Sequence, residues 1–283
     1  MASRPDGTTN TPKRAATENG RGTGGTGFRQ TLMATFRPRP RTPHGTAQLI
    51  IEQAPRSPAS EAYRTLRTNL QFRSLDKPFR TLVVTSATTG EGKTTTVANF
   101  GAVVAQAGIR VCLIDSDLRR PNLHRVFGRD NTRGLTTALV EDLPPSAVAQ
   151  STHIPNLSVV TTGPLPPNPA ELAGSKRMRR FLETGVREFD LLLCDTPPVL
   201  AVADGLAVAA QCDGIILVVA AGAAPADVVR RAREHIIAVK GEIVGVLLNR
   251  VDFQRDGYYY ASYYRYEGDR ESAGERPPTK ASG

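Results

Sequence analysis

The sequence predicts an α/β fold with an open, mostly parallel sheet and helices on both faces. Strand-type and helix-type segments alternate between residues 81 and 249, which is the pattern of parallel strands joined by helical crossovers. The strand-type segments are apolar throughout, as strands covered on both faces are. A glycine-rich segment follows the first of these strands and opens a helix. Ligands in such folds bind at the carboxyl ends of the strands, so we expect the functional site there.

The predicted elements follow one another without an internal repeat. A first helix begins at Ser57, and its apolar residues recur at spacings of three and four, which forms one stripe: Ala62, Tyr63, Leu66 and Leu70. Strands are predicted at 81–86, 110–115, 157–160, 190–195, 214–220 and 242–249. Helices are predicted at 94–106 and near 175–188, 203–211 and 225–239.

Length and composition limit the class of protein. A chain of 283 residues with 40% apolar residues can form one core with appendages, which excludes disorder throughout. The longest apolar run, residues 215–226, is shorter than the roughly 20 residues of a membrane-spanning helix, and the opening residues lack the apolar stretch of a secretion signal. We therefore expect a cytoplasmic chain. Its three widely spaced cysteines, Cys112, Cys194 and Cys212, are expected to be reduced core residues.

The basic charge is concentrated at the N-terminus. Residues 1–45 contain eight Lys or Arg and two Asp or Glu, which is +6 of the total +9. Seven Gly, five Pro and nine Thr in the same segment predict a disordered basic tail. It is interpreted either as a solvated extension or as an attachment to anionic lipid or an acidic partner. Because residues 46–283 carry only +3, nucleic acid is not an expected partner.

The sharpest motif is SATTGEGKTT, residues 86–95. Gly90 and Gly92 allow backbone N–H groups to wrap a phosphate chain, and the following helix directs its positive end at the anion. Lys93 can reach the β- and γ-phosphates, and the Thr94 hydroxyl can join a magnesium shell. The strict pattern has glycine where Ala87 stands. A glycine turn that only caps a helix is the structural alternative.

Carboxylates follow two further predicted strands. Asp115 and Asp117 end the segment LIDSD, and Asp195 ends LLLCD. An isolated Asp at a strand end is usually a helix cap or turn residue. Here, however, parallel strands place all three at the same sheet edge as the phosphate loop, where they can converge on one Mg²⁺ and on the atom that attacks the γ-phosphate.

Residues 57 to about 266 resemble the bacterial tyrosine kinases (BY-kinases) of the CpsD and CapB type, which govern capsule and exopolysaccharide synthesis and have a MinD/ParA-like P-loop NTPase fold. The resemblance is carried by GEGKTT ending at Thr95, LIDSDLRRP at 113–121, LLLCDTPP at 191–198, EAYRTLR at 61–67 and the tyrosine-rich end. One departure is Thr89, where these kinases commonly carry proline.

The resemblance implies an ATP- and Mg²⁺-dependent protein tyrosine kinase. Asp115, helped by Asp117, would orient or deprotonate the tyrosine, and Asp195 would hold Mg²⁺ with Thr94 and Asp115. Asn249 would lie at the adenine. The nucleotide-binding loop residues would be Gly90, Glu91, Gly92, Lys93, Thr94 and Thr95.

Two other functions remain open from the sequence. MinD- and ParA-type ATPases, which act as positioning switches, share the fold and the first two aspartates. They carry a signature lysine five residues before the loop lysine, and this chain has Thr88 there. A nucleotide-binding scaffold without catalysis is the other alternative.

The C-terminal segment supplies a candidate substrate. Six of the seven tyrosines fall within nine residues, and adjacent positions cannot share one helix or strand face. They are Tyr258, Tyr259, Tyr260, Tyr263, Tyr264 and Tyr266. We predict an autophosphorylated strip, in which six phosphates would add about −9 to −12 of charge. A sticky segment that stacks on a partner is the alternative.

The resemblance also implies partners. Glu61, Arg64 and Arg67 would form contacts in a ring of subunits, although a solvated helix face with local ion pairs explains them too. Without a membrane helix, the chain resembles the split form that is recruited to the inner membrane face by a separate activator of the polysaccharide co-polymerase type. Other tyrosine substrates and a phosphotyrosine phosphatase follow from the same resemblance. The predicted organisation is a basic tail at 1–45, a kinase domain at 46–252 with its N-terminal oligomerisation helix, and a flexible tyrosine-rich tail at 253–283.

Overall fold

The computed structural model describes residues 49–74 and 78–251. The strands are β1 (Thr81–Ser86), β2 (Val111–Asp115), β3 (Gln150–Ser151), β4 (Leu157–Val160), β5 (Leu191–Asp195), β6 (Gly214–Ala220) and β7 (Ile243–Asn249). The helices are α1 (Ile50–Gln53), α2 (Pro58–Arg73), α3 (Lys93–Gln106), α4 (Leu123–Phe127), α5 (Leu135–Glu141), α6 (Pro169–Ala173), α7 (Lys176–Glu188), α8 (Asp204–Ala209) and α9 (Ala226–Ala238), with a 3-10 turn at Pro145–Ala147. The predicted basic and tyrosine-rich tails lie outside the described residues.

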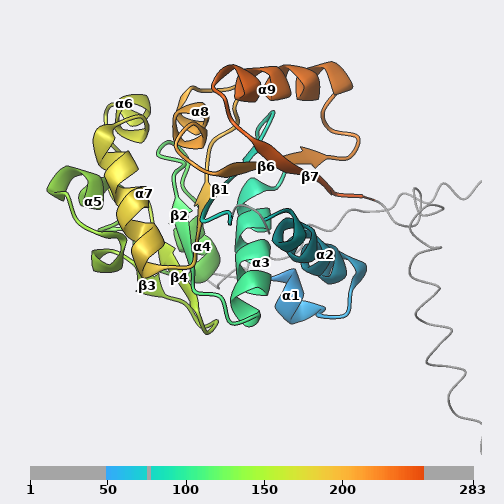
Figure 1. The fold of residues 1–283 in the computed structure, drawn as a ribbon, viewed down its shortest axis with the longest axis horizontal. Coiled ribbons are helices and arrows are strands. Elements are labelled where there is room, and N and C mark those ends of the chain that lie inside the picture. Colours follow the sequence, from blue (N-terminus) through green and yellow to red (C-terminus); the bar gives the residue numbers. More distant parts are fainter. Residues whose placement is uncertain (1–48, 75–77, 252–283) are drawn as a thin grey trace, which may run out of the picture. The chain divides into compact units, whose positions relative to one another are not determined.

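The strands form one sheet in the order β3-β4-β2-β5-β1-β6-β7. Every described pairing is parallel except that of the short edge strand β3 with β4. The mostly parallel sheet predicted from sequence is therefore confirmed (Figure 1). The order places β5 between β1 and β2, so the ends of these three strands meet at the centre of one edge.

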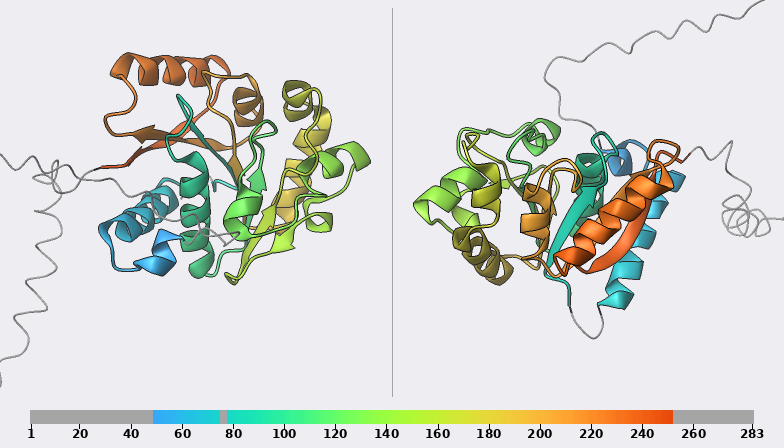
Figure 2. Two further views of the ribbon diagram at one scale, coloured as in Figure 1. Left: turned by 180° about the vertical axis from the view of Figure 1, so that it is seen from behind. Right: turned by 90° about the horizontal axis from the view of Figure 1, so that it is seen from above.

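Successive side chains of each strand point to opposite faces of the sheet and pack into two separate hydrophobic cores. Leu82, Val84 and Leu113 pack with residues of α1, α2, α3 and α4 on one face. Val83 and Ile114 pack with residues of α5 through α9 on the other. Helices therefore cover both faces, as predicted, and Figure 2 shows the early helices in blue and teal apart from the later ones in yellow and orange.

The principal predicted elements are present, and the short ones were missed. The strands predicted at 110–115, 190–195 and 242–249 start one residue later, at Val111, Leu191 and Ile243. Helices α1, α4 and α5 and strand β3 were not predicted, because elements of four, five, seven and two residues are too short to display a hydrophobic period. Helix α6, also not predicted, begins at Pro169 in a proline-rich stretch, where proline suits the first helical position.

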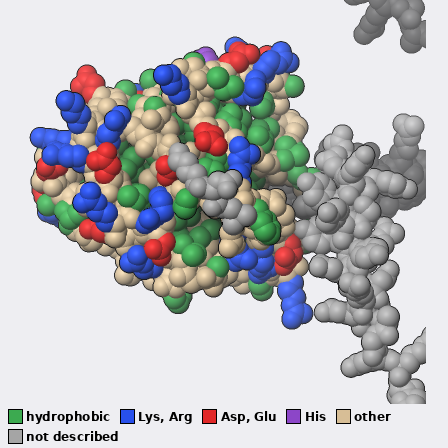
Figure 3. Space-filling view, viewed as in Figure 1, with side chains coloured by type: hydrophobic (Ala, Val, Ile, Leu, Met, Phe, Trp, Pro, Cys, Tyr) green, Lys and Arg blue, Asp and Glu red, His purple; other side chains and the backbone are tan. Residues whose placement is uncertain are grey.

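Three further observations concern the class of protein. In the part of the chain that the structure describes, no helix is long and apolar enough to cross a membrane. The three cysteines are free, two of them buried. Figure 3 shows basic and acidic side chains intermixed on one face. Surface ion pairs include Arg180 with Asp142 and Arg133 with Glu141.

Candidate nucleotide-binding site

The loop between β1 and α3 has the backbone conformation that its glycines predict. Gly90 and Gly92 have φ values of +83° and +99°, a region that side chains rarely adopt. A Cβ on Gly92 would also lie 2.1 Å from Nδ2 of Asn249. Helix α3 begins at Lys93, so its unpaired N-terminal amides face the loop. This arrangement is a cradle for phosphate.

Glu91 shapes the cradle from within. Its side chain is 1% exposed, and Oε1 accepts hydrogen bonds from N and Oγ1 of Thr88 at 2.6 and 2.9 Å. Its other oxygen accepts from N of Ala220 at 3.1 Å. The side chain therefore ties the loop to the end of β6, and its backbone amide remains the group that can face a phosphate. The position was predicted to bind nucleotide; a bracing role for the carboxylate was not foreseen.

Asp115 and Asp195 lie opposite each other in the register of β2 and β5. They are 0% and 1% exposed. Oδ2 of Asp115 accepts hydrogen bonds at 2.9 Å from N of Asn122 and N of Leu123. Oδ1 of each aspartate is buried without a hydrogen-bond partner among the described residues. Buried polar atoms are rarely left unpaired, so these two oxygens are suited to bind a cation.

Burial controls the protonation of this pair. It raises the pKa of Asp115 to about 7, against the opposing hydrogen bonds from Leu123 and Asn122. Burial and the negative charge of Asp115 also raise the pKa of Asp195 well above its usual value, opposed by a hydrogen bond with Thr94 and the positive charge of Lys93. A cation between the two carboxylates would favour their charged forms.

Lys93 stands beside this pair. It is 8% exposed, and its Nζ donates to Oγ of Ser86 at 3.2 Å. Burial lowers the pKa of Lys93, while Asp195, Asp117 and Glu91 act in the opposite direction. The structure thus brings Lys93 and Asp195 together at the edge predicted from the strand order.

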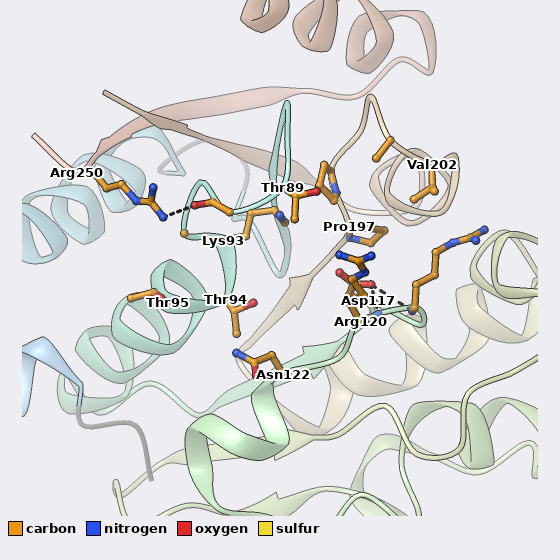
Figure 4. Close-up of a pocket in the computed structure, with 15 residues that line it drawn as sticks. Thr89, Lys93, Thr94, Thr95, Asp117, Arg120, Asn122, Pro197, Val202 and Arg250 are labelled. Atoms are coloured by element: carbon orange, nitrogen blue, oxygen red, sulfur yellow. Dashed lines mark hydrogen bonds between the residues drawn. The ribbon is translucent and has the colours of Figure 1, made fainter. Parts of the chain in front are cut away.

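Asp117, Arg119 and Arg120 line a cavity of about 570 Å³ at this site. Oδ1 of Asp117 accepts hydrogen bonds from N of Arg119 at 3.2 Å and N of Arg120 at 2.9 Å. Figure 4 shows Asp117 and Arg120 below Pro197, with Arg250 at the far end of the cavity. The cavity is also lined by Gly90, Gly92, Lys93, Thr94, Thr95 and Asn122. Its size suits the phosphates and part of the nucleoside of a nucleotide.

The residues present fit a magnesium ion. No group of three or more His, Cys, Asp or Glu side chains in the described ranges could form a complete protein cage for a metal. Mg²⁺ does not need one, because it usually keeps several waters and binds one or two carboxylates together with substrate phosphates. Thr94 and the orphaned oxygens of Asp115 and Asp195 supply oxygen ligands of this kind.

Other predicted residues are placed without their roles being tested. Asn249, at the end of β7, donates through Nδ2 to the carbonyl of Glu91 at 2.8 Å, so its predicted contact with adenine stays a prediction. On α2, Glu61 and Arg64 form an ion pair with each other, and Arg67 donates to the carbonyl of Val103 at 3.5 Å.

Sequence reasoning did not assign Arg119, Arg120, Asp204 or Arg250 to this site. Arg119 forms an ion pair with Asp204, with Nε and Oδ2 2.6 Å apart. Arg250 lines the cavity and donates to the carbonyl of Gly90 (Figure 4). Arg119 lay inside a motif that was noticed for its aspartates, whereas no sequence signal joins Asp204 or Arg250 to the site.

The fold and this edge define a class of protein. The profile of the CobQ/CobB/MinD/ParA nucleotide binding domain matches residues 82–270. The chain is thus a member of that nucleotide-binding class. Its P-loop, central aspartates and strand order agree with the assignment.

Relatives narrow the class. The chain is 40% identical over 216 residues to tyrosine-protein kinase YwqD of Bacillus subtilis, covering 76% of this chain and 90% of that protein. The crystal structure of the chimerical protein CapA2B2 matches at 34% identity with a TM-score of 0.68, covering 74% and 93% of the two chains. The kinase domain of Escherichia coli tyrosine kinase ETK matches at 32% identity with a TM-score of 0.69, covering 76% and 87%. The chain belongs to the bacterial tyrosine kinases, as its motifs predicted.

Proposed function

We propose that the protein transfers the γ-phosphoryl group of ATP to tyrosine, with Mg²⁺ as cofactor, in a pathway that makes capsule or exopolysaccharide. The observation that carries this proposal is the pair of buried carboxylates, Asp115 and Asp195, whose unpaired oxygens lie in register beside Lys93 and the phosphate loop. Membership of the tyrosine kinase family supports the choice of acceptor.

Each side chain has a distinct task in this proposal. The loop amides and Lys93 bind and neutralise phosphate oxygens. Thr94, Asp115 and Asp195 would hold Mg²⁺, which would neutralise negative charge on the phosphates. Asp115, with Asp117 beside it, orients the phenol and accepts its proton. The reaction needs positioning and charge stabilisation more than covalent help from the protein.

The experiment is incubation of the full chain with Mg²⁺ and ATP, followed by detection of phosphotyrosine and of released phosphate. We expect labelled tyrosine with the wild type and none with Lys93→Met. Release of phosphate without labelled tyrosine would instead support the positioning ATPase. Nucleotide binding with neither product would support a scaffold. Against the ATPase, Thr88 supplies no charge, and its hydroxyl is engaged with Glu91.

We further propose that the acceptors are Tyr258, Tyr259, Tyr260, Tyr263, Tyr264 and Tyr266, presented to the site of a neighbouring subunit. Changing all six to phenylalanine should remove most self-labelling and leave ATP binding unchanged. Full-strength labelling of that variant would contradict the assignment. Other proteins and a phosphotyrosine phosphatase would share these tyrosine phosphates as substrates.

The assembly is also a proposal. Glu61, Arg64 and Arg67 would contact the next subunit of a ring, and a membrane activator of the polysaccharide co-polymerase type would recruit the chain from the cytoplasm to the inner membrane face. A similar structure is described as the chimerical protein CapA2B2. Replacing the three α2 residues by alanine should lower the sedimentation mass, and an unchanged mass would leave them as a solvated face.

A further inference from the structure

Four cations line the cavity within the described ranges: Lys93, Arg119, Arg120 and Arg250. Three of their head groups have partners. Lys93 donates to Ser86, Arg119 pairs with Asp204, and Arg250 donates to the carbonyl of Gly90. The guanidinium of Arg120 has no hydrogen bond or ion pair with any residue that the structure describes. Its backbone amide alone is engaged, with Asp117.

The two adjacent arginines are held differently. The carboxylate of Asp204 is fully buried, and it takes two hydrogen bonds from Arg119, 2.6 Å from Nε and 3.3 Å from Nη2. This anchors the 116–122 segment to the start of α8 on the far side of the cavity wall. The next side chain, Arg120, is then left exposed and lining the cavity, beside Asp117 and below Pro197 in Figure 4. The carboxylate of Asp117 accepts hydrogen bonds from the backbone amides of Arg119 and Arg120, which fixes the turn that carries them.

In phosphoryl transfer, charge spreads over the three equatorial oxygens of the γ-phosphate in the transition state, and an arginine besides the loop lysine and the metal can stabilise it. Thr88 supplies no such positive charge. Because an arginine fork matches two phosphate oxygens at once, we infer that Arg120 is the second cation of the site and contacts the transferring phosphoryl group. This inference rests on the proposed function and adds a residue to it.

The step balances as follows. The bond between the γ-phosphorus and the β–γ bridging oxygen breaks, and its electron pair leaves with ADP. A phenolate oxygen of tyrosine forms the new bond to phosphorus, and the phenolic proton goes to an aspartate of the site. Arg120 neither gives nor takes a proton, since guanidinium stays charged in proteins. It neutralises the oxygens of the phosphoryl group while the two bonds exchange.

Two measurements on the full chain test the inference. The first is the affinity of Arg120→Met for ADP and for the non-hydrolysable triphosphate AMP-PNP, both with Mg²⁺. We expect AMP-PNP affinity to fall about tenfold or more and ADP affinity to change less than about threefold. The second is the self-labelling rate, which should fall about 100-fold or more. Arg120→Lys should recover part of both losses because it keeps the charge without the fork.

Arg125→Met is the matched control, because Arg125 is an exposed arginine of α4 outside the cavity lining and its loss makes the same change in net charge. It should leave both measurements at wild-type values. Equal losses of ADP and AMP-PNP affinity in Arg120→Met, or unchanged binding and labelling, would overturn the inference. If the wild type binds nucleotide but labels no tyrosine, the proposed function fails, and the ratio of the two affinities still decides the role of Arg120.

Discussion

Carboxylates at the two ends of the parallel strands have opposite environments. We call the side of the sheet where the strands begin the amino edge, and the side where they end the carboxyl edge. At the amino edge, Asp190 precedes β5 and accepts from N, Nε and Nη2 of Arg110 at 2.9 to 3.1 Å. Asp213 precedes β6, and its Oδ2 accepts from N of Arg80 and from N and Oγ1 of Thr81. At the carboxyl edge, Asp115 and Asp195 are buried, and each keeps an oxygen without a partner.

The pKa directions follow this difference. Hydrogen bonds from Arg110 lower the pKa of Asp190 to about 2, whereas burial raises the pKa of Asp115 to about 7. At the amino edge, these hydrogen bonds therefore favour the charged form of Asp190 in the free protein. At the carboxyl edge, burial disfavours the charged forms of Asp115 and Asp195 unless a cation binds between them. One edge stabilises the fold, and the other gives up stability to keep a binding site open.

The two ends of β5 provide the largest test of this comparison. Asp195→Asn should reduce tyrosine labelling about 100-fold or more, because it removes a charge that would hold Mg²⁺. Asp190→Asn, at the other end of the same strand, should leave labelling within about twofold of wild type. Rates at saturating ATP measure both. Similar losses in the two variants would mean that disturbance of β5, and not loss of a ligand, explains the effect.

The second test uses the free energy of unfolding of the protein without nucleotide, in EDTA. Between about pH 4, where an unfolded Asp ionises, and about pH 7, folded Asp115 still holds a proton that the unfolded chain has lost. Stability therefore falls as pH rises through this window. Asp115→Asn removes this contribution, so its stability relative to wild type should grow with pH and level off above pH 7, by at most about 4 kcal/mol. Urea unfolding at pH 4.5, 6 and 8 measures it, and a constant difference would contradict the assignment.

The sequence was sufficient to predict the carboxyl edge because its signals are local. A strand followed by a phosphate loop, and strands ended by Asp115 and Asp195, need only the rule that parallel strands share an edge. The long apolar strands and the helices that separate them were equally readable, because their hydrophobic periods extend over enough residues.

The supporting contacts could not be predicted in this way. Asp204 meets Arg119 across 85 positions, and Glu91 meets Ala220 across 129. Neither pairing leaves a periodic or motif signal, because each depends on how loops from different strands pack over the edge. Glu91 was recognised as part of the phosphate loop, but the direction of its side chain depends on the position of β6.

Glu91 is a carboxylate at the carboxyl edge whose two oxygens both accept hydrogen bonds, and it gives the third test. In Glu91→Gln, an NH₂ group replaces one carboxylate oxygen. That group cannot accept the hydrogen bond that Thr88 or Ala220 donates to the oxygen in the wild type. We expect the free energy of unfolding to fall by about 1 to 3 kcal/mol and nucleotide affinity to weaken as the loop loses its brace. Thr88→Val is the matched control, since it removes the hydroxyl contact and keeps the backbone one. A greater loss in Thr88→Val than in Glu91→Gln would contradict the bracing role.

Asp190 gives the smallest and most diagnostic effect on stability. Its side chain is 41% exposed, so solvent screens the pair with Arg110, and Asp190→Asn should cost less than about 1 kcal/mol at pH 7. The pKa of Asp190 is lower in the folded protein than in the unfolded chain. The contribution of Asp190 to the free energy of unfolding is therefore complete above about pH 4 and disappears as pH falls toward 2. High salt should reduce it as well. Urea unfolding at pH 7 and pH 2.5 measures the change, and its direction with pH is opposite to that expected for Asp115. If Asp190→Asn instead gained stability as pH rose, the two edges would share one electrostatic character, and the orphaned oxygens of Asp115 and Asp195 would no longer distinguish a binding edge from a structural one.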